Sequence, residues 1–199
     1  MARKELKNIF LSASIPLKER HYKYYNTADI IAIRDSVIAL ASLVIPKYRL
    51  IWGGHPSITP IIYYVLEKYK IDIQSHVKLY QSEHFEKIFP IENKEFETVV
   101  ITEDLGELKP SLRLMRERML GENTFEAGVF IGGMDGIEDE YTLFRELNPR
   151  SIILPIASTG AASRIIFDSL LPDDEARQER FLKDYGYMSL FQKYLMDRI

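Results

Sequence analysis

Apolar residues in this 199-residue chain gather in short continuous runs, and the segments between the runs carry apolar residues at helical spacing. A continuous apolar run bounded by turn residues is typical of a strand that is buried on both faces of a sheet. Six runs predict strands, at residues 8–16, 48–52, 77–82, 97–102, 127–131 and 151–156.

The segments between these runs predict helices at residues 28–44, 58–69, 112–120 and 137–147, and from 158 to about 171. Thr27 and Ser111 are the expected N-caps of the first and third helices, because a hydroxyl can accept a hydrogen bond from a free N–H of the first turn. A loop is expected at residues 18–26, and an irregular segment containing Pro90 is expected before the fourth strand.

Strands that alternate with helices predict an α/β fold with a mainly parallel sheet and helices on both faces. Crossovers between parallel strands are right-handed, so the carboxyl ends of the strands share one edge, where ligands bind in open sheets of this kind. We expect this domain to span residues 1–171. The tail, residues 172–199, is predicted to be helical with a break at Gly186, and its apolar residues form either an oligomer interface or a contact with their own sheet.

Composition excludes several functional classes. The 26 basic and 29 acidic residues give a net charge of -3, so the chain lacks the basic footprint of bulk nucleic-acid binding. Without cysteine there are no disulfides, thiolate metal sites or cysteine nucleophiles. The histidines His21, His76 and His84 have no metal-ligand spacing, so no metal site is predicted. No window approaches the ~20 apolar residues of a membrane span, and a soluble cytoplasmic protein is expected.

Four strand-to-helix loops carry small or polar residues, and the topology places all four at the carboxyl edge of the sheet. Glycine there would let a phosphate or ribose approach the backbone, and a helix N-terminus favours an anion. Short glycine-rich loops also occur in α/β folds that bind nothing. The candidate ligand-binding residues are Ser12, Ala13 and Ser14; Gly53, Gly54, His55, Pro56 and Ser57; Gly132, Gly133, Met134, Asp135 and Gly136; and Ser158, Thr159 and Gly160.

Two common nucleotide motifs do not occur. The dinucleotide fingerprint requires G-x-G-x-x-G in the first strand-to-helix turn, whereas the paired glycines here follow the second and fifth strands. A P-loop requires Gly-Lys-Ser/Thr, which the sequence lacks.

The two glycine segments, Ile51-Trp-Gly-Gly-His-Pro-Ser-Ile-Thr-Pro60 and Phe130-Ile-Gly-Gly-Met-Asp-Gly-Ile-Glu-Asp-Glu140, together resemble the SLOG superfamily. This Rossmann-like fold is named for the DNA-processing protein Smf and the cytokinin-activating LOG enzymes. The resemblance covers residues 8–167 and leaves the tail outside. It is greatest to the sensor branch, found in ion channels and bacterial anti-phage systems, and it implies a nucleotide or NAD-derived ligand.

The resemblance also implies a role for Glu140. In LOG enzymes the second motif reads P-G-G-x-G-T-x-x-E, and its glutamate helps to cleave an N-glycosidic bond. Glu140 matches that glutamate if Asp135 is a one-residue insertion. Ile131 in place of the proline and Ile137 in place of the threonine are further departures, and they favour sensing over hydrolysis. From the residues alone, a carboxylate near a helix N-terminus could bind ribose hydroxyls or simply complement the helix dipole.

Other side chains carry alternatives that the sequence leaves open. Arg164 is expected to face the ligand edge, because a guanidinium binds phosphate through two hydrogen bonds. Arg34 could also reach a phosphate or form an ion pair with an acidic neighbour. His55 could bind a ligand or serve as a turn residue. The tyrosines of the first loop could stack on a base or pack on the sheet; they are Tyr22, Tyr24 and Tyr25.

These observations support three hypotheses. In the first, the chain is a cytoplasmic sensor domain for a nucleotide or NAD-derived molecule in bacterial defence or signalling, acting as a homo-oligomer or with a partner protein. In the second, it is a nucleotide N-glycosidic hydrolase or transferase that uses Glu140. The first strand, from Ile9 to Ala13, is similar to that of nucleoside deoxyribosyltransferases, which supports this alternative. In the third, the chain is a structural subunit with a vestigial pocket.

Overall fold

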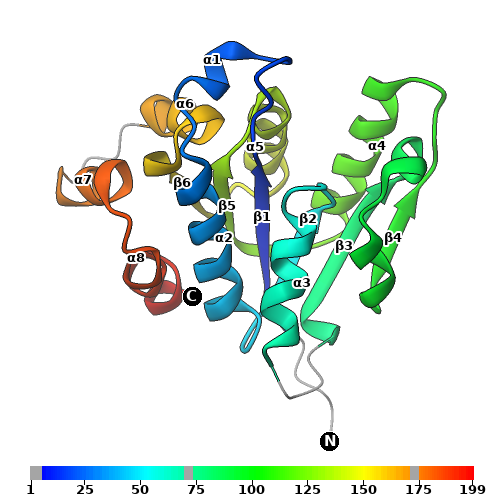
Figure 1. Cartoon of the computed structure of the whole chain (residues 1–199). Helices are drawn as coiled ribbons and strands as arrows, with labels where there is room; N and C mark the ends of the chain where they lie inside the picture. The colour runs from blue at the N-terminus through cyan, green and yellow to red at the C-terminus, as the bar shows by residue number, and fades with distance from the viewer. Residues whose placement is uncertain (1–5, 70–73, 171–174) are drawn as a thin grey trace, which may run out of the picture.

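Six parallel strands form one sheet in the order β4-β3-β2-β1-β5-β6 (Figure 1). The computed structural model describes residues 6–69, 74–170 and 175–199. The strands are β1 (Asn8–Ser14), β2 (Arg49–Gly53), β3 (Val77–Ser82), β4 (Val99–Thr102), β5 (Phe125–Gly132) and β6 (Ile152–Ile156). All six predicted strands are therefore confirmed, and so is the Rossmann-like α/β fold.

The strand order reverses beside β1. The chain moves outward from β1 to β4 on one side, then returns to place β5 against the other side of β1. In open α/β sheets such a switch point separates the neighbouring strand-to-helix loops and leaves room for a ligand. The loops after β1 and β5 are both glycine- or serine-containing segments that the sequence singled out.

Helices cover both faces of the sheet. The first face carries α2 (Ile30–Val44), α3 (Thr59–Glu67) and, farther along the chain, α8 (Tyr187–Tyr194). The second carries α4 (Leu108–Gly121), α5 (Asp135–Leu147) and most of the buried side of α6 (Ala161–Leu170). Alternate residues of one strand enter opposite cores: Ile9 and Leu11 enter the first, and Phe10 enters the second. Burial on both faces explains why the inner strands are apolar runs, whereas the edge strand β4 is only partly buried.

The predicted helices form, but two predicted caps are wrong. Asp29 caps α2 by accepting a hydrogen bond from the Ala32 N–H at 2.9 Å. Thr27 instead accepts from the Ala161 N–H at 3.1 Å, and so serves α6 from a distant part of the chain. Helix α4 begins at Leu108, before Ser111, whose hydroxyl donates to the Glu107 carbonyl at 2.7 Å.

Two segments expected to be irregular contain short helices. The predicted loop holds α1 (Tyr22–Tyr25), whose Tyr24 is buried. The connections around β3 hold the 3-10 turns η1 (Gln74–His76), η2 (Glu83–Ile88) and η3 (Ile91–Glu95). A further 3-10 turn, η4 (Ala157–Thr159), lies between β6 and α6.

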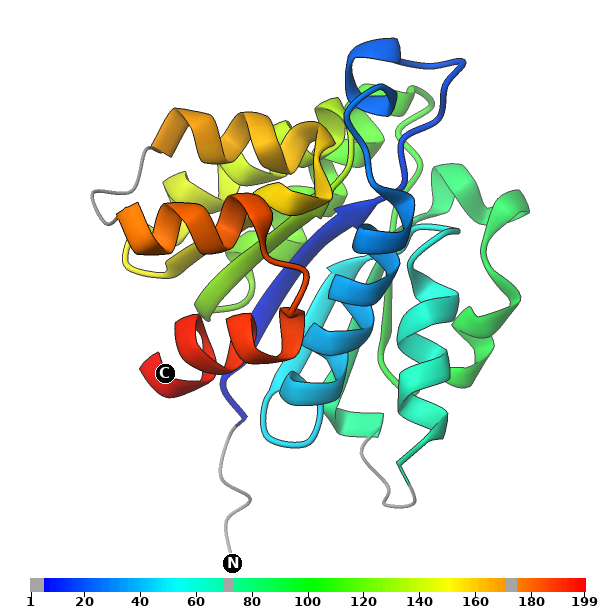
Figure 2. The same cartoon turned by 60° about the vertical axis from the view of Figure 1, so that its left-hand side comes forward.

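The tail folds back on the domain. It contains α7 (Glu175–Lys183), α8 and the 3-10 turn η5 (Met196–Arg198), with the predicted break at Gly186. Figure 2 shows α8 beside α2. All the buried apolar residues in the described part of the tail, residues 175–199, join the first core; these are Phe181, Tyr187, Leu190, Phe191, Tyr194 and Leu195. Their burial matches the alternative in which the tail packs on its own subunit.

Candidate functional site

Hydrogen bonds connect the four predicted loops at the carboxyl edge. The Gly133 N–H donates to the Ser14 carbonyl at 2.9 Å, which joins the β5 and β1 loops. The Gly132 N–H donates to Thr159 Oγ1 at 2.9 Å, which joins the β5 and β6 loops. The Ile15 N–H reaches Ser57 Oγ at 3.4 Å, which joins the β1 and β2 loops. The topology therefore brings together the segments that the sequence identified.

Glu140 lies within this group of loops, on the second turn of α5. Ser12 Oγ, from the end of β1, donates to Glu140 Oε2 at 2.6 Å. Arg116 Nε, from α4, lies 3.4 Å from Glu140 Oε1. The side chains of Arg116 and Glu140 are only 12% and 14% exposed, so both are held in place and shielded from most of the solvent. Three elements thus fix one carboxylate at the switch point.

Two predicted glycines lie beside this carboxylate and guanidinium. A Cβ at Gly53 would lie 3.2 Å from Met115 Cε and 3.9 Å from Glu140 Oε1. A Cβ at Gly136 would lie 2.8 Å from an Arg116 guanidinium nitrogen, closer than real Cβ contacts. A side chain at Gly136 would crowd the Arg116 guanidinium, and one at Gly53 would crowd Met115 beside Glu140.

Gly132 and Gly133 are required for the shape of the loop. Their φ angles of +58° and +81° are in the left-handed region that favours glycine. Their N–H groups donate to Thr159 and Ser14, so they are already used within the protein. These two amides consequently brace the loop, and any backbone donors for an anion must come from the first turn of α5.

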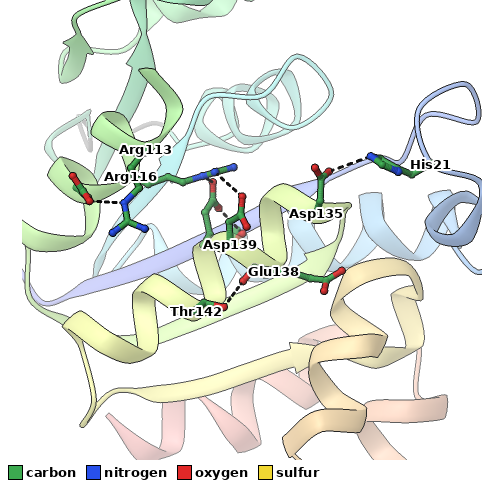
Figure 3. Close-up of polar contacts among 10 residues, drawn as sticks. His21, Arg113, Arg116, Asp135, Glu138, Asp139 and Thr142 are labelled. Carbon is green, nitrogen blue, oxygen red and sulfur yellow. Dashed lines mark hydrogen bonds and ion pairs between the residues drawn. The ribbon is translucent and has the colours of Figure 1, made fainter. Parts of the chain in front are cut away.

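That first turn is unusually acidic for a phosphate site. Asp135 lies 3.8 Å from His21, and Asp139 pairs with Arg116 at 3.0 Å (Figure 3). Glu138 accepts a hydrogen bond from Tyr24 and lies 3.8 Å from Lys23. Together with Glu140 these make four carboxylates in the first two turns of α5, matched by two permanently charged cations. Anions are stabilised at a helix N-terminus by its positive potential, and these carboxylates oppose that effect.

His55 is a neutral hydrogen-bonding residue. Burial, assisted by the positive charge of Arg20, lowers the pKa of His55 to about 4. Its Nδ1 lies 2.8 Å from Ser57 Oγ and accepts from the Ser57 N–H at 3.2 Å. Because Nδ1 is the acceptor, the ring proton is on Nε2. These contacts form a turn that orders the loop after β2. The Nε2–H of His55 remains able to donate to a ligand.

Arg34 and Arg164 form ion pairs with exposed neighbours. Arg34 lies 2.8 Å from Asp35, and Arg164 reaches both oxygens of Asp168, at 2.9 and 3.1 Å. Both arginines are exposed. Arg34 therefore forms an ion pair, which is one of its two predicted roles. Arg164 also forms an ion pair, with an acidic residue on its own helix.

The β6 loop turns partly away from Glu140. Ser158 Oγ donates to the Asp184 carbonyl at 3.1 Å and lies 3.1 Å from the Tyr187 hydroxyl, so it contacts the tail. Gly160 has a φ of +72°, and a Cβ there would lie 1.8 Å from the Thr27 carbonyl oxygen. This loop therefore mainly joins α2, α6 and the tail.

The remaining predicted residues have packing or surface positions. Ala13 packs against the first core, and Met134 is buried in the second. Pro56 is exposed in the turn of the β2 loop. Of the three tyrosines, Tyr24 is buried against α5, whereas Tyr22 is 65% exposed and free to cover a neighbouring group.

Sequence reasoning missed Arg116 and Arg20. The available signal for Arg116 was its place on the predicted helix 112–120, beside Met115 and one turn before Met119. A charged residue between two buried ones on a helix marks a position at the border of the core. Arg20 offered no such signal, because it lies in a charged loop whose path depends on the whole fold.

Within residues 6–69, 74–170 and 175–199, no three His, Asp or Glu side chains are grouped as metal ligands would be. No helix in those residues has both the length and the apolar character needed to cross a membrane.

Comparisons with known proteins agree with the fold of the chain. The chain resembles the X-ray structure of TM1055, a target of the Northeast Structural Genomics Consortium, with a TM-score of 0.57 and 16% identity over 87% of this chain and 89% of that one. A search of curated proteins found no match. Residues 23–195 match the model of the SLOG cluster3 family, so the match runs through most of the tail. The predicted SLOG resemblance is confirmed, and the chain belongs to the SLOG cluster3 family.

Proposed function

We propose that this chain is a binding module for a nucleotide or NAD-derived small molecule, whose ribose is bound by Glu140. The observation that carries this proposal is the Ser12–Glu140–Arg116 contact at the carboxyl ends of β1 and β2. A carboxylate accepts hydrogen bonds in several directions, and Ser12 and Arg116 occupy only part of that capacity. Neighbouring hydroxyl groups of a ribose are suitable donors for the rest.

The charges around the site suggest how a phosphate would be oriented. The acidic first turn of α5 disfavours a phosphate directly at that helix end. The β1–α2 segment carries Lys18 and Arg20, and Arg20 is close enough to His55 to influence its titration. A ligand with its ribose at Glu140 and its phosphate toward Arg20 would satisfy both observations.

A binding titration tests this proposal. AMP, nicotinamide mononucleotide, ADP-ribose and ribose 5-phosphate are each titrated into the protein by calorimetry, and the solution is analysed for released base. We expect at least one of these compounds to bind without turnover. Absence of binding by every compound would refute the proposal.

The fixed position of Glu140 also favours a second function, N-glycosidic cleavage. A carboxylate held on two sides can stabilise the positive charge that develops at an anomeric carbon as the bond to the base breaks. Base release from a nucleotide, abolished in Glu140→Gln, would support this function. Binding with no release over hours at micromolar protein would exclude it for the compounds tested.

As a sensor, the chain would need a way to transmit occupancy. A second copy of the chain or another protein, in a defence or signalling system, would provide the output. Size-exclusion chromatography with light scattering, with and without a bound compound, measures whether occupancy changes the assembly.

A further inference from the structure

Gln81 carries a buried carboxamide with an unpaired donor. It is the penultimate residue of β3 and is only 3% exposed. Within the described residues, its Nε2 is buried and has no hydrogen-bond partner. Most buried polar groups are paired, because an unpaired one loses its hydrogen bonds to water without replacement. An apolar side chain of similar shape would avoid that loss.

The carboxamide lies directly on Gly54. A Cβ at Gly54 would be 1.9 Å from Gln81 Nε2 and 2.2 Å from its carboxamide carbon, so any other residue at this position would displace the carboxamide. The Gly54 N–H donates to the Tyr80 carbonyl at 2.8 Å, which holds the end of β2 against β3 at this level. Gly54 therefore serves to bring the Gln81 carboxamide to the carboxyl edge of the sheet.

Gln81 and Glu140 lie on opposite sides of the Gly53–Gly54 pair. Successive residues of a strand face opposite sides of a sheet. Gly53 faces Met115 and Glu140 on the side of the second core, whereas Gly54 faces Gln81 on the side of the first core. A carboxylate and a carboxamide thus flank two residues that have no side chains, at the edge where the proposed ligand binds.

We propose that Gln81 is a second subsite, which binds the planar end of the ligand through an edge that carries a hydrogen-bond acceptor beside a donor. This inference rests on the proposed function and extends it to the class of ligand. A glutamine carboxamide presents one donor group next to one acceptor, and so complements a carboxamide or an aminopurine edge. The ligand spans Gly53 and Gly54, with its ribose at Glu140 and this planar edge at Gln81.

Three compounds separate the subsite from the rest of the site. AMP and nicotinamide mononucleotide carry both a ribose phosphate and such an edge, whereas ribose 5-phosphate carries the ribose phosphate alone. The test variant is Gln81→Met, which keeps the length of the side chain and removes its hydrogen-bonding groups. The control is Asn93→Leu, because Asn93 lies in η3 near the amino end of β4 and its buried amide also lacks a partner.

Calorimetry should show that Gln81→Met weakens binding of AMP or nicotinamide mononucleotide at least about tenfold and leaves ribose 5-phosphate unchanged. Asn93→Leu should change none of these affinities. The melting temperature of unliganded Gln81→Met should equal or exceed that of the wild type, since an unpaired buried donor has been removed.

Two results would overturn the subsite. If a nucleotide binds equally to the wild type and to Gln81→Met, the carboxamide does not contact the ligand. If Gln81→Met melts at a lower temperature and weakens all three compounds alike, the carboxamide is structural. Failure of the proposed function gives a different result, since none of the three compounds would then bind the wild type.

Discussion

The carboxyl edge around Glu140 and the C-terminal tail around α8 are built in opposite ways. In the tail, aromatic and aliphatic side chains fill the first core, and Phe191 and Leu190 are completely buried. At the edge, charged groups are held at low exposure, and a buried donor of Gln81 has no partner in the described chain. Packing in the tail stabilises the fold. The groups at the carboxyl edge are costly to bury, and we attribute the retention of Glu140 and Gln81 to ligand binding.

This difference can be tested first by removing a large side chain from the tail. Phe191→Ala should lower the free energy of unfolding by about 4 kcal/mol, because a buried phenyl ring leaves a cavity. Urea denaturation measures this change, and any nucleotide affinity of the folded fraction should be unaltered. A loss below about 1 kcal/mol would mean that the tail is not part of the core.

A glycine at the edge should affect stability, because the shape of its loop depends on it. Gly133→Ala should lower the free energy of unfolding by about 3 kcal/mol, from the positive φ together with a clash with Ile137. A Cβ at this position would lie 2.1 Å from Ile137 Cγ1. Gly121→Ala, at the end of α4 where a Cβ meets only Leu147 at 3.9 Å, is the matched control and should be nearly neutral. Equal stability of the two variants would contradict the assigned loop conformation.

His55 should make the edge sensitive to acid. The pKa of His55 is lowered to about 4 in the folded protein by burial and by Arg20, against an ordinary value of 6.5. The unfolded chain therefore takes up this proton first as the pH falls. The contribution of His55 to the free energy of unfolding is therefore fully present above pH 6.5. It decreases as the pH falls to about 4 and is constant below that.

The loss over this interval should reach up to about 3 kcal/mol. His55→Asn keeps an acceptor for Ser57 and removes the titrating group. Unfolding free energies measured from pH 7.5 to 4 should therefore fall less steeply in the variant. Parallel curves would show that His55 is not buried as described.

The smallest effect is expected at Arg164. Arg164→Ala should change the free energy of unfolding by less than about 0.5 kcal/mol, because its pair with Asp168 is exposed. It should also leave nucleotide affinity unchanged, since the guanidinium is occupied on the surface of α6. A tenfold loss of nucleotide affinity would show that Arg164 contacts the ligand, as the sequence predicted.

Much of the fold could be predicted from the sequence, because continuous apolar runs identify strands that are buried on both faces. Parallel topology then places the ends of β1, β2, β5 and β6 at one edge. Side-chain contacts could not be predicted in the same way. The position of Arg116 beside Glu140 depends on how α4 and α5 pack, and the use of the Gly132 and Gly133 amides depends on neighbouring loops. The tail showed its apolar character in the sequence, but only the fold reveals that α2 buries it.

A matched pair of variants on α5 tests whether Glu140 binds the ligand. Glu140→Gln and Glu146→Gln make the same change on the same helix, but Glu146 is exposed and lies six residues farther along α5. By calorimetry with AMP, Glu140→Gln should weaken binding by about 10- to 100-fold, as expected for lost hydrogen bonds to a charged group, while Glu146→Gln keeps the wild-type affinity. Equal affinities of both variants for AMP would show that Glu140 does not bind the ligand.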